Sequence, residues 1–528
     1  MSRRWIYYGL VIFALFNPVV SAATAPPRPH ILLAIADDWS FGHAGVYGCK
    51  WVKTPHFDRI AREGILFQRA YTPNAKCSPS RAALLTGRNP WQLGAGANHF
   101  CYFPAEFSTY PEVLERHGYF VGMTAKGWSP GVALDAAGRS RDLAGKRFDL
   151  HALTPPTTGI LPIDYAANFR SFLDAAPSEQ PWCFWFGAGE PHRDYEEGSG
   201  VQYGGKKTEM IDRVPACWPD DEVIRNDMLD YAVEVEWFDA QLGKMIAELA
   251  ARNLLDSTWI IVTSDNGMPF PRMKGNTYDG SNRLPLAMRW PAGIQNPGRV
   301  EDGYVSLIDL APTIIEAASL TEKDHGMAAM TGRSLSDIFA DVPDRKTRDQ
   351  VILGRERNDV GRPNDLGYPT RGIVRENFLY LKNYAPDRWP AGNPETGYLD
   401  ADAGSAKTHV LNSRKNGCDP RFWQACFGKR PAQELYNLTE DPDCMMNLAE
   451  DLKSAQTMAK MSTRLFEELK QQGDPRIIEG GEPFEKFPNA EGPMVDYHRR
   501  FLQGDAGLAP WARSTDYEPI IPSPYSSD

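Results

Sequence analysis

The sequence predicts an α/β protein whose main unit is a mainly parallel sheet flanked by helices, followed by a smaller α+β unit with an antiparallel sheet. Two observations support this fold class. Over the first two thirds of the chain, short apolar runs alternate with helical patterns, which is typical of a parallel sheet covered on both faces by helices. After about residue 345 the sequence becomes turn-rich with short strand candidates, which favours a small antiparallel sheet beside the first unit.

The alternation can be followed segment by segment. Short apolar runs indicate strands at 30–38, 181–189 and 257–267. Helical patterns occupy 57–67, 163–176 and 228–253, and a helix leads into a strand over 110–126. In open sheets of this kind, ligands gather at the carboxyl ends of the strands. Residues that follow the strands are therefore the first candidates for a site.

The first residues have the pattern of a signal peptide. Arg3 and Arg4 precede an almost wholly apolar run over 5–20, and small residues follow before Pro26. The run is short for a bilayer and its flank resembles a cleavage site, so we expect removal of residues 1–25, with a membrane anchor as the alternative. No later segment is long and apolar enough to span a membrane. We therefore expect a secreted or periplasmic protein.

The charge balance disfavours some partners. The 528 residues carry a formal net charge of -11, with 42% hydrophobic and 24% charged residues. This is a globular composition, and its net charge gives no reason to expect binding to nucleic acid. An anionic substrate must instead meet a local cluster of cations. The length suggests about two or three structural units, and the sequence gives no indication of oligomeric state.

The eight cysteines are too few for a disulfide scaffold in a chain of this length. Cys418 and Cys426 are close enough in sequence to pair, and free thiols are the equal alternative. No CxxC or HxxxH spacing accompanies the others, so we expect no zinc site and interpret them as buried small apolar residues. These are Cys49, Cys101, Cys183 and Cys217.

Polar side chains follow two of the predicted strands. Asp37 and Asp38 come after ILLAIA, and Asp265 and Asn266 come after WIIVTS. One aspartate pair alone would more simply cap the next helix. Two such strand ends in one sheet instead predict a site with three carboxylates and an amide oxygen, a hard ligand set that suits calcium or magnesium.

A further constellation surrounds one of the cysteines. Cys77-Ser78-Pro79-Ser80-Arg81, followed by LTGR at 85–88, resembles the signature of the type I sulfatases, C-x-P-S-R then L-T-G-R. The likeness continues through the aspartate pair, SDNG at 264–267, MKGNTYDG at 273–280 and LIDLAPTIIEAA at 307–318, and covers roughly residues 28 to 345. It implies an alkaline-phosphatase-like fold, with a catalytic domain over 26–365 and a C-terminal subdomain over 366–528.

The resemblance implies a mechanism that depends on formylglycine. A maturation enzyme would oxidise Cys77 to formylglycine, whose hydrate can attack sulfur with one hydroxyl and later expel sulfate by reforming the aldehyde. One Ca²⁺, or less favourably Mg²⁺, would assist. Its implied ligands are Asp37, Asp38, Asp265, Asn266 and the modified Cys77. Arg81 would hold the diol, Lys126 and Lys274 would hold the sulfate oxygens, and His192 would lie near the leaving group.

One position departs from the family pattern. Many sulfatases have G-K-x-H where this chain has Ala125-Lys126-Gly127-Trp128, so Trp128 replaces a histidine that is thought to help regenerate the aldehyde. Tryptophan cannot accept that proton, so water, the metal-bound diol or another side chain must take the role, or turnover is slower. His43, His99 and His151 are structural by default, although His99 lies shortly after the signature and can line the pocket.

The segment at 354–384 resembles the corresponding part of N-sulfoglucosamine sulfohydrolases and their bacterial relatives. It predicts substrate binding by Arg357, Asp359 and Arg371, with Trp389 stacking on a sugar ring, while a solvated charged loop is the alternative. We therefore expect a sulfated saccharide as the substrate, cleaved at its non-reducing end. N-sulfoglucosamine is favoured over 6-O-sulfated amino sugars, galactose or fucose.

Two other classes of function remain open at this point. A phosphodiesterase or phosphonate hydrolase of the same superfamily would share the fold and the metal ligands, but the complete signature disfavours it. A non-catalytic glycan-binding protein would share the fold alone. The presence of Cys77 together with Arg81, Lys126 and His192 argues against it.

Overall fold

The computed structural model describes residues 1, 5, 28–342, 347–417 and 419–519. The predicted signal peptide therefore falls almost wholly outside the described residues, and Cys418 does too. Within the described residues, no helix has the length and apolar character needed to cross a membrane.

The main sheet is mixed but parallel at its centre, as predicted. Among the described residues it has nine strands in the order β10-β2-β9-β8-β1-β7-β4-β6, with β11 also paired to β2. Strands β8, β1, β7 and β4 run parallel, whereas β9 is antiparallel to both of its neighbours. The bounds are β1 His30–Ala36, β2 Ile65–Tyr71, β4 Phe120–Ala125, β6 Lys146–Arg147, β7 Trp182–Gly187, β8 Thr258–Ser264, β9 Arg283–Arg289, β10 Arg299–Glu301 and β11 Val305–Ser306.

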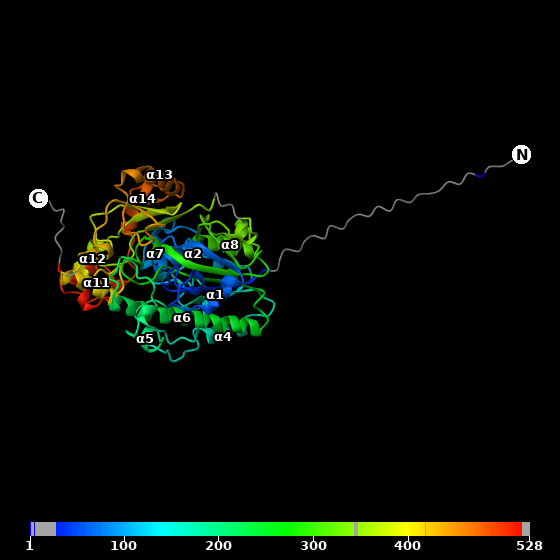
Figure 1. The fold of residues 1–528 in the computed structure, drawn as a ribbon. Helices are drawn as coiled ribbons and strands as arrows, with labels where there is room; N and C mark the ends of the chain where they lie inside the picture. The colour runs from blue at the N-terminus through cyan, green and yellow to red at the C-terminus, as the bar shows by residue number, and fades with distance from the viewer. Residues whose placement is uncertain (2–4, 6–27, 343–346, 418, 520–528) are drawn as a thin grey trace.

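Helices cover both faces of this sheet because its central strands are apolar on both sides. In β1, Leu32 and Ala34 belong to one buried cluster, and Leu33 and Ile35 belong to the other, as the alternation of side chains along a strand requires. Figure 1 shows α4 and α6 on one side of the sheet and α2 and α8 on the other. The flanking helices are α1 Pro55–Arg62, α2 Cys77–Thr86, α3 Tyr110–Arg116, α4 Tyr165–Ala175, α6 Glu222–Ala251 and α8 Leu310–Ala317.

The predicted helix at 57–67 ends earlier than expected. Helix α1 stops at Arg62, and residues from Ile65 onward form β2. Gly64 lies between them, at a point where an added Cβ would meet the backbone oxygen of Met288 at 1.8 Å. The close approach of β9 therefore breaks the helical pattern at this glycine.

The second unit is a small antiparallel sheet in the order β12-β13-β14-β15, which confirms the predicted fold class. One face packs against α13 and the other against Tyr71 and Tyr278 of the main unit. The predicted boundary at 365 falls between β12 and β13, so the antiparallel sheet begins before it. The bounds are β12 Gln350–Arg355, β13 Thr370–Arg375, β14 Phe378–Asn383, β15 Gln433–Asn437 and α13 Ala455–Gln471.

Short elements complete the described chain. A two-stranded parallel sheet pairs β3 with β5. The remaining elements are β3 Cys101–Phe103, β5 Gly131–Ala133, α5 Ser199–Gln202, α7 Asp279–Asn282, α9 Glu322–His325, α10 Ser336–Phe339, α11 Ser405–Lys415, α12 Pro420–Cys426, α14 Pro475–Ile478, α15 Glu482–Lys486 and α16 Tyr497–Leu502.

The cysteines behave mostly as expected. Cys101, Cys183 and Cys217 are buried, whereas Cys49 is only partly buried. Cys426 is a buried free thiol that donates a hydrogen bond to the backbone oxygen of Cys217 over 3.4 Å. A disulfide between Cys426 and Cys418 is not tested, because Cys418 lies outside the described residues.

Candidate active site

The carboxyl ends of β1 and β8 bring four polar residues together. The two strands pair in parallel with Ala36 opposite Ser264, so the residues that follow each strand are neighbours. The backbone nitrogen of Asp38 donates to Oδ1 of Asp265 over 3.1 Å. Oxygens of Asp37, Asp38 and Asp265 lie within 4.8 Å of one another. The clustering that the sequence predicts at this edge is therefore present.

The donor set at this edge fits a hard divalent cation. All three aspartates are almost fully buried, and burial raises the pKa of Asp265 to about 7 although Arg81 opposes this. The side-chain nitrogen of Asn266 donates to Asp38 over 2.6 Å. Its Oδ1 is buried without a hydrogen-bond partner among the described residues. An unpartnered amide oxygen beside three carboxylates is the arrangement expected of an oxygen-ligand metal site.

Cys77 is the first residue of α2, so its side chain faces this edge. Ser80, one turn on, anchors the helix by donating its hydroxyl to the backbone oxygen of Asp265 over 2.6 Å. The Cys77 sulfur lies 3.6 Å from Oδ1 of Asp37. Burial, with the charge of Asp37, raises the pKa of the Cys77 thiol to about 12. The unmodified thiol is therefore protonated and a poor nucleophile at neutral pH.

Arg81 joins the carboxylates to the strand that precedes Lys126. It lies one helical turn after Cys77 and is fully buried. Its Nε contacts Oδ2 of Asp265 at 2.8 Å, and its Nη2 contacts Oδ1 of Asp37 at 3.3 Å. Its Nη1 donates to the backbone oxygens of Lys126 and Gly127. Arg81 therefore fixes the relative positions of α2, β4 and the strand-end carboxylates.

Two lysines bring further positive charge. Nζ of Lys126 lies 2.5 Å from Oδ2 of Asp37, and Nζ of Lys274 lies 2.8 Å from both Asp38 and Asp402. Burial disfavours ionisation of Asp37, but Lys126 and Arg81 hold its pKa well below the usual range. The site is therefore a compact array of opposite charges that can accommodate an anion and a cation together.

His192 lies at the opening of this array. Its Nδ1 is 2.6 Å from the backbone oxygen of Arg193, so this nitrogen carries the proton. Its Nε2 lies 4.0 Å from Oδ2 of Asp38, and the side chain is 35% exposed. The exposed Nε2 is therefore positioned to exchange a proton with a bound molecule.

Three residues at the site were missed or left open by the sequence. Asp402 forms an ion pair with Lys274. Its carboxylate also lies 4.0 Å from Nζ of Lys76, and that nitrogen lies 3.1 Å from Asp359. Asp402 is distant in sequence from every strand end, so only the tertiary structure identifies it. His99 is buried, and both ring nitrogens lack a partner among the described residues. Burial and the charge of Lys76 hold the pKa of His99 well below its usual value, so His99 is neutral.

Trp128 supports the cysteine segment. Its indole nitrogen donates to the backbone oxygen of Ser78 over 3.0 Å, and its ring packs edge-on against Phe103. The residue in place of the family's second histidine therefore holds the first turn of α2 and contributes no proton acceptor.

A cavity of about 380 Å³ opens onto the candidate catalytic groups. Asp37, Lys126 and His192 form one part of its wall. Arg147 and Asp149 form another part and contact each other at 2.6 Å. Asp149 is fixed by the backbone nitrogen of Ala125 and the hydroxyl of Thr124. No sequence motif marks the residues of this wall.

The four predicted substrate residues do not line this cavity. Arg371 is fully buried, 2.7 Å from both Glu356 and Asp474, so its guanidinium is enclosed by these ion pairs, and its contact with a substrate stays a prediction. Arg357 is also buried and donates to backbone oxygens of Phe487 and Pro488. Of the four, Asp359 comes nearest the catalytic groups, through Lys76. Trp389 packs against Trp423 at a ring distance of 6.1 Å.

The chain is similar to known proteins over most of its length. The model of the family described as Sulfatase matches residues 29–320. Human N-sulphoglucosamine sulphohydrolase is 27% identical over 488 residues, which covers 85% of this chain and 91% of the relative. Human arylsulfatase A is 26% identical over 521 residues, with coverage of 87% and 90%.

A solved structure provides a third comparison. It holds a protein in complex with its substrate D-glucosamine-2-N,6-O-disulfate, and it matches with a TM-score of 0.60 at 19% identity. The match covers 87% of this chain and 100% of that chain. At this identity the likeness shows a shared fold.

Proposed function

The chain belongs to the Sulfatase family and is a sulfuric ester hydrolase, and on this premise we propose that it removes sulfate from the non-reducing end of a sulfated glycan. The favoured terminal sugar is N-sulfoglucosamine. The observation that carries the proposal is the position of Cys77 beside Asp37, with Lys126 and His192 in the wall of one cavity.

The working group at Cys77 is proposed to be formylglycine, made by a maturation enzyme. The hydrated aldehyde supplies two hydroxyls, one to attack sulfur and one to release sulfate. A calcium ion held by Asp37, Asp38, Asp265, Asn266 and residue 77 supplies charge stabilisation when bound. The unpartnered Oδ1 of Asn266 and the three clustered carboxylates support this assignment.

The protein's own side chains then have separable roles. Arg81 orients residue 77 from one turn along α2, while Lys126 and Lys274 offset the negative charge of the sulfate. His192 acts as the general acid in its doubly protonated form: Nδ1–H stays bonded to the backbone oxygen of Arg193, and Nε2 gives its proton to the leaving nitrogen or oxygen. Loss of sulfate from an amine breaks the sulfur–nitrogen bond and leaves a free amine on the sugar.

The substrate assignment draws on the cavity and on the relatives. A cavity of about 380 Å³ lies at the small end of ligand pockets, about 300–1,000 Å³, which suits one terminal sugar better than a chain interior. The human relative is named for N-sulphoglucosamine, which favours the N-sulfate. The solved structure holds a glucosamine with both an N-sulfate and a 6-O-sulfate, which supports a sulfated glucosamine without choosing between the two positions. Arg147 and Asp149 are the proposed contacts to the sugar, and Asp359 remains a candidate through its contact with Lys76.

The site of action is proposed to be outside the cytoplasm. The charged and apolar pattern of the first residues supports export. The partners proposed for the protein are then a sulfated saccharide and a maturation enzyme that acts on Cys77.

Two measurements test the proposal. The first is peptide mass analysis of protein produced with a maturation enzyme, which should show CHO in place of CH2SH at Cys77, with the peptide of buried Cys183 unchanged as the internal control. An unmodified thiol at Cys77 in fully active protein would remove the mechanism.

The second measurement identifies the product from defined saccharides with a terminal N-, 2-O-, 3-O- or 6-O-sulfate. We expect a free amine on terminal glucosamine. Turnover of O-sulfated sugars alone would replace the N-sulfate assignment and leave the sulfatase assignment standing.

A further inference from the structure

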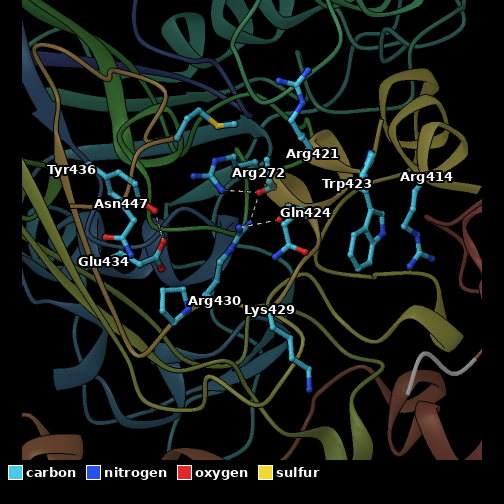
Figure 2. Close-up of a pocket in the computed structure, with 14 residues that line it drawn as sticks. Arg272, Arg414, Arg421, Trp423, Gln424, Lys429, Arg430, Glu434, Tyr436 and Asn447 are labelled. Atoms are coloured by element: carbon cyan, nitrogen blue, oxygen red, sulfur yellow. Dashed lines mark hydrogen bonds between the residues drawn. The ribbon is translucent and has the colours of Figure 1, made fainter. Parts of the chain in front are cut away.

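A second cavity lies apart from the catalytic one. It has a volume of about 600 Å³ and is bounded by α12 and β15 (Figure 2). The residues that line it and those that line the catalytic cavity do not overlap. Its size is within the range of pockets that bind small ligands, about 300–1,000 Å³. The cavity is therefore large enough for a ligand of its own.

Positive charge gathers around this cavity. The charged residues in its wall are five cations and one carboxylate: Arg272, Arg414, Arg421, Lys429, Arg430 and Glu434. The carboxylate of Glu434 is buried and accepts hydrogen bonds from the hydroxyls of Tyr278 and Tyr436. This concentration of cations occurs in a chain whose net charge is -11. The pocket therefore provides a local field that attracts anions.

Some of these cations already have partners. Arg414 is paired with Glu518, and Arg421 contacts Asp419 at 2.7 Å. Arg272 and Arg430 both donate to the backbone oxygen of Ala425 at the end of α12. These contacts hold the wall of the cavity in place.

Three of these cations form no ion pair with a carboxylate among the described residues: Arg272, which is buried, and Lys429 and Arg430. Lys429 and Arg430 are partly exposed, and among the residues that the structure describes no ion pair joins either to an acidic group. Lys429 lies over the ring of Trp389 at 5.2 Å, and Figure 2 shows its side chain extending away from that of Arg430, which points toward Arg272 and Gln424. Both can therefore receive an anionic group of a ligand.

Aromatic rings lie beside the cations. Trp423 lines the cavity, and the guanidinium of Arg414 lies 4.0 Å above its ring (Figure 2). Trp389 packs against Trp423 at 6.1 Å and is partly buried. A sugar ring presents C–H faces to aromatic rings and sulfate or carboxylate groups to cations. A wall that combines both matches an anionic saccharide better than a simple anion.

We propose that this cavity is a second, non-catalytic binding site for a sulfated oligosaccharide, with Lys429 as its main uncompensated cation. The ligand class is that of the proposed function, but the site is separate from the catalytic cavity. It would hold a distant part of the glycan, or a second glycan chain, while the terminal sugar reacts. Trp389, which the sequence predicts to stack on a sugar ring, would then contact a sugar bound at this second site.

The test measures binding without turnover. A Cys77→Ala variant is combined with Lys429→Glu, and binding of a fully sulfated heparin-type tetrasaccharide is followed by calorimetry at low and physiological salt. We expect affinity to fall about tenfold or more, because the change replaces an attraction with a repulsion. The matched control is Lys460→Glu, which makes the same charge change at an exposed position of α13 and should bind like the parent.

Two further results make the proposal falsifiable. Equal affinity in Lys429→Glu and the parent would overturn it, provided that the melting temperatures agree. Displacement by inorganic sulfate at the same concentration as the tetrasaccharide would overturn the saccharide assignment.

Turnover of a sulfated monosaccharide by the matured enzyme should be unchanged in Lys429→Glu. A failure of the proposed N-sulfatase activity would appear in that assay, and a failure of the second site would appear only in the binding assay. The two proposals can therefore fail separately.

Discussion

Two regions of this molecule bury clusters of charged side chains, and they differ in what those charges can reach. At the carboxyl edge of the parallel sheet, the cluster of Asp37, Asp265 and Arg81 is continuous with Lys126 and His192, which open to a cavity. In the antiparallel unit, Glu356, Arg371 and Asp474 pair with one another and are sealed from solvent. Buried charge is common to both, so it does not by itself identify a site.

The compensation of charge distinguishes the two clusters. In the antiparallel unit, Arg371 has a carboxylate on each side, and Arg476 also donates to Glu356. At the sheet edge, Asn266 keeps an unpartnered oxygen, and burial raises the pKa of Asp265 to about 7. The cluster in the antiparallel unit is electrostatically complete, whereas the cluster at the sheet edge can accept another cation. This difference predicts different consequences when one member of each cluster is removed.

The largest effect is expected from Asp265→Ala. The change removes one of three clustered carboxylates and the partner of Arg81, so bound metal and turnover should both fall to background. Metal content by mass spectrometry and sulfate release report the two losses. Asp239→Ala is the control, because Asp239 is equally buried but accepts hydrogen bonds from the first turn of α1. An Asp265→Ala protein with normal metal content and turnover would show that the edge is not the metal site.

The strand-end residues could be predicted from sequence because topology dictates their position. A buried parallel strand ending in Asp37 and Asp38, and another ending in Asp265, must place these residues at one edge if the strands are neighbours. The signature around Cys77 added the cysteine and Arg81 through its resemblance to the family pattern, but no helix at α2 is among the sequence predictions. No detail of side-chain packing was needed to place the strand-end residues.

The residues proposed to contact the sugar could not be predicted in this way. A run such as RERND contains the same residue types whether it contacts a ligand or forms ion pairs, and the partners of Arg371 at 356 and 474 are revealed only by tertiary structure. Asp402 and Asp149 lie in connecting segments, and Arg147 lies in the two-residue strand β6, and none of them belongs to a sequence motif. Their positions depend on how distant segments pack.

The next effect in size concerns His192, the most exposed of the catalytic candidates. His192→Ala should lower kcat/KM on an N-sulfated sugar by roughly 10²–10⁴-fold, the range for loss of a general acid. The loss should be much smaller on an activated aryl sulfate, whose leaving group needs little protonation. Parallel assays on both substrates measure the difference. Equal losses on both would indicate that His192 positions the substrate and does not transfer a proton.

The sealed cluster should respond in stability and not in catalysis. Arg371→Ala leaves Glu356 and Asp474 without this partner in the interior, which should cost about 3–5 kcal/mol of unfolding free energy. Arg375→Ala, on the same strand, breaks a partly exposed pair with Asp349 and should cost no more than about 1 kcal/mol.

Urea unfolding measures the stability of both variants, and KM on the sugar is compared for the folded fractions. A raised KM in Arg371→Ala with unchanged stability would restore the substrate role that the ion pairs argue against. Unchanged KM with reduced stability would confirm the contrast between the two clusters.

The smallest effect is expected from a change in the wall of the catalytic cavity, where Arg147 and Asp149 are the proposed contacts to the sugar. Arg147 is 52% exposed and contacts Asp149, which keeps its hydrogen bonds to Ala125 and Thr124 when Arg147 is removed. Arg147→Ala should therefore leave the wall intact and raise KM for the saccharide about tenfold, the loss of one charge-assisted hydrogen bond, with kcat nearly unchanged. The control is Arg139→Ala, which removes a more exposed arginine that pairs with Asp135 outside the cavity. A change in kcat on aryl sulfate would place Arg147 in the chemical step. An unchanged KM for the saccharide would show that the sugar is recognised by another surface, and Asp359 would be the next residue to test.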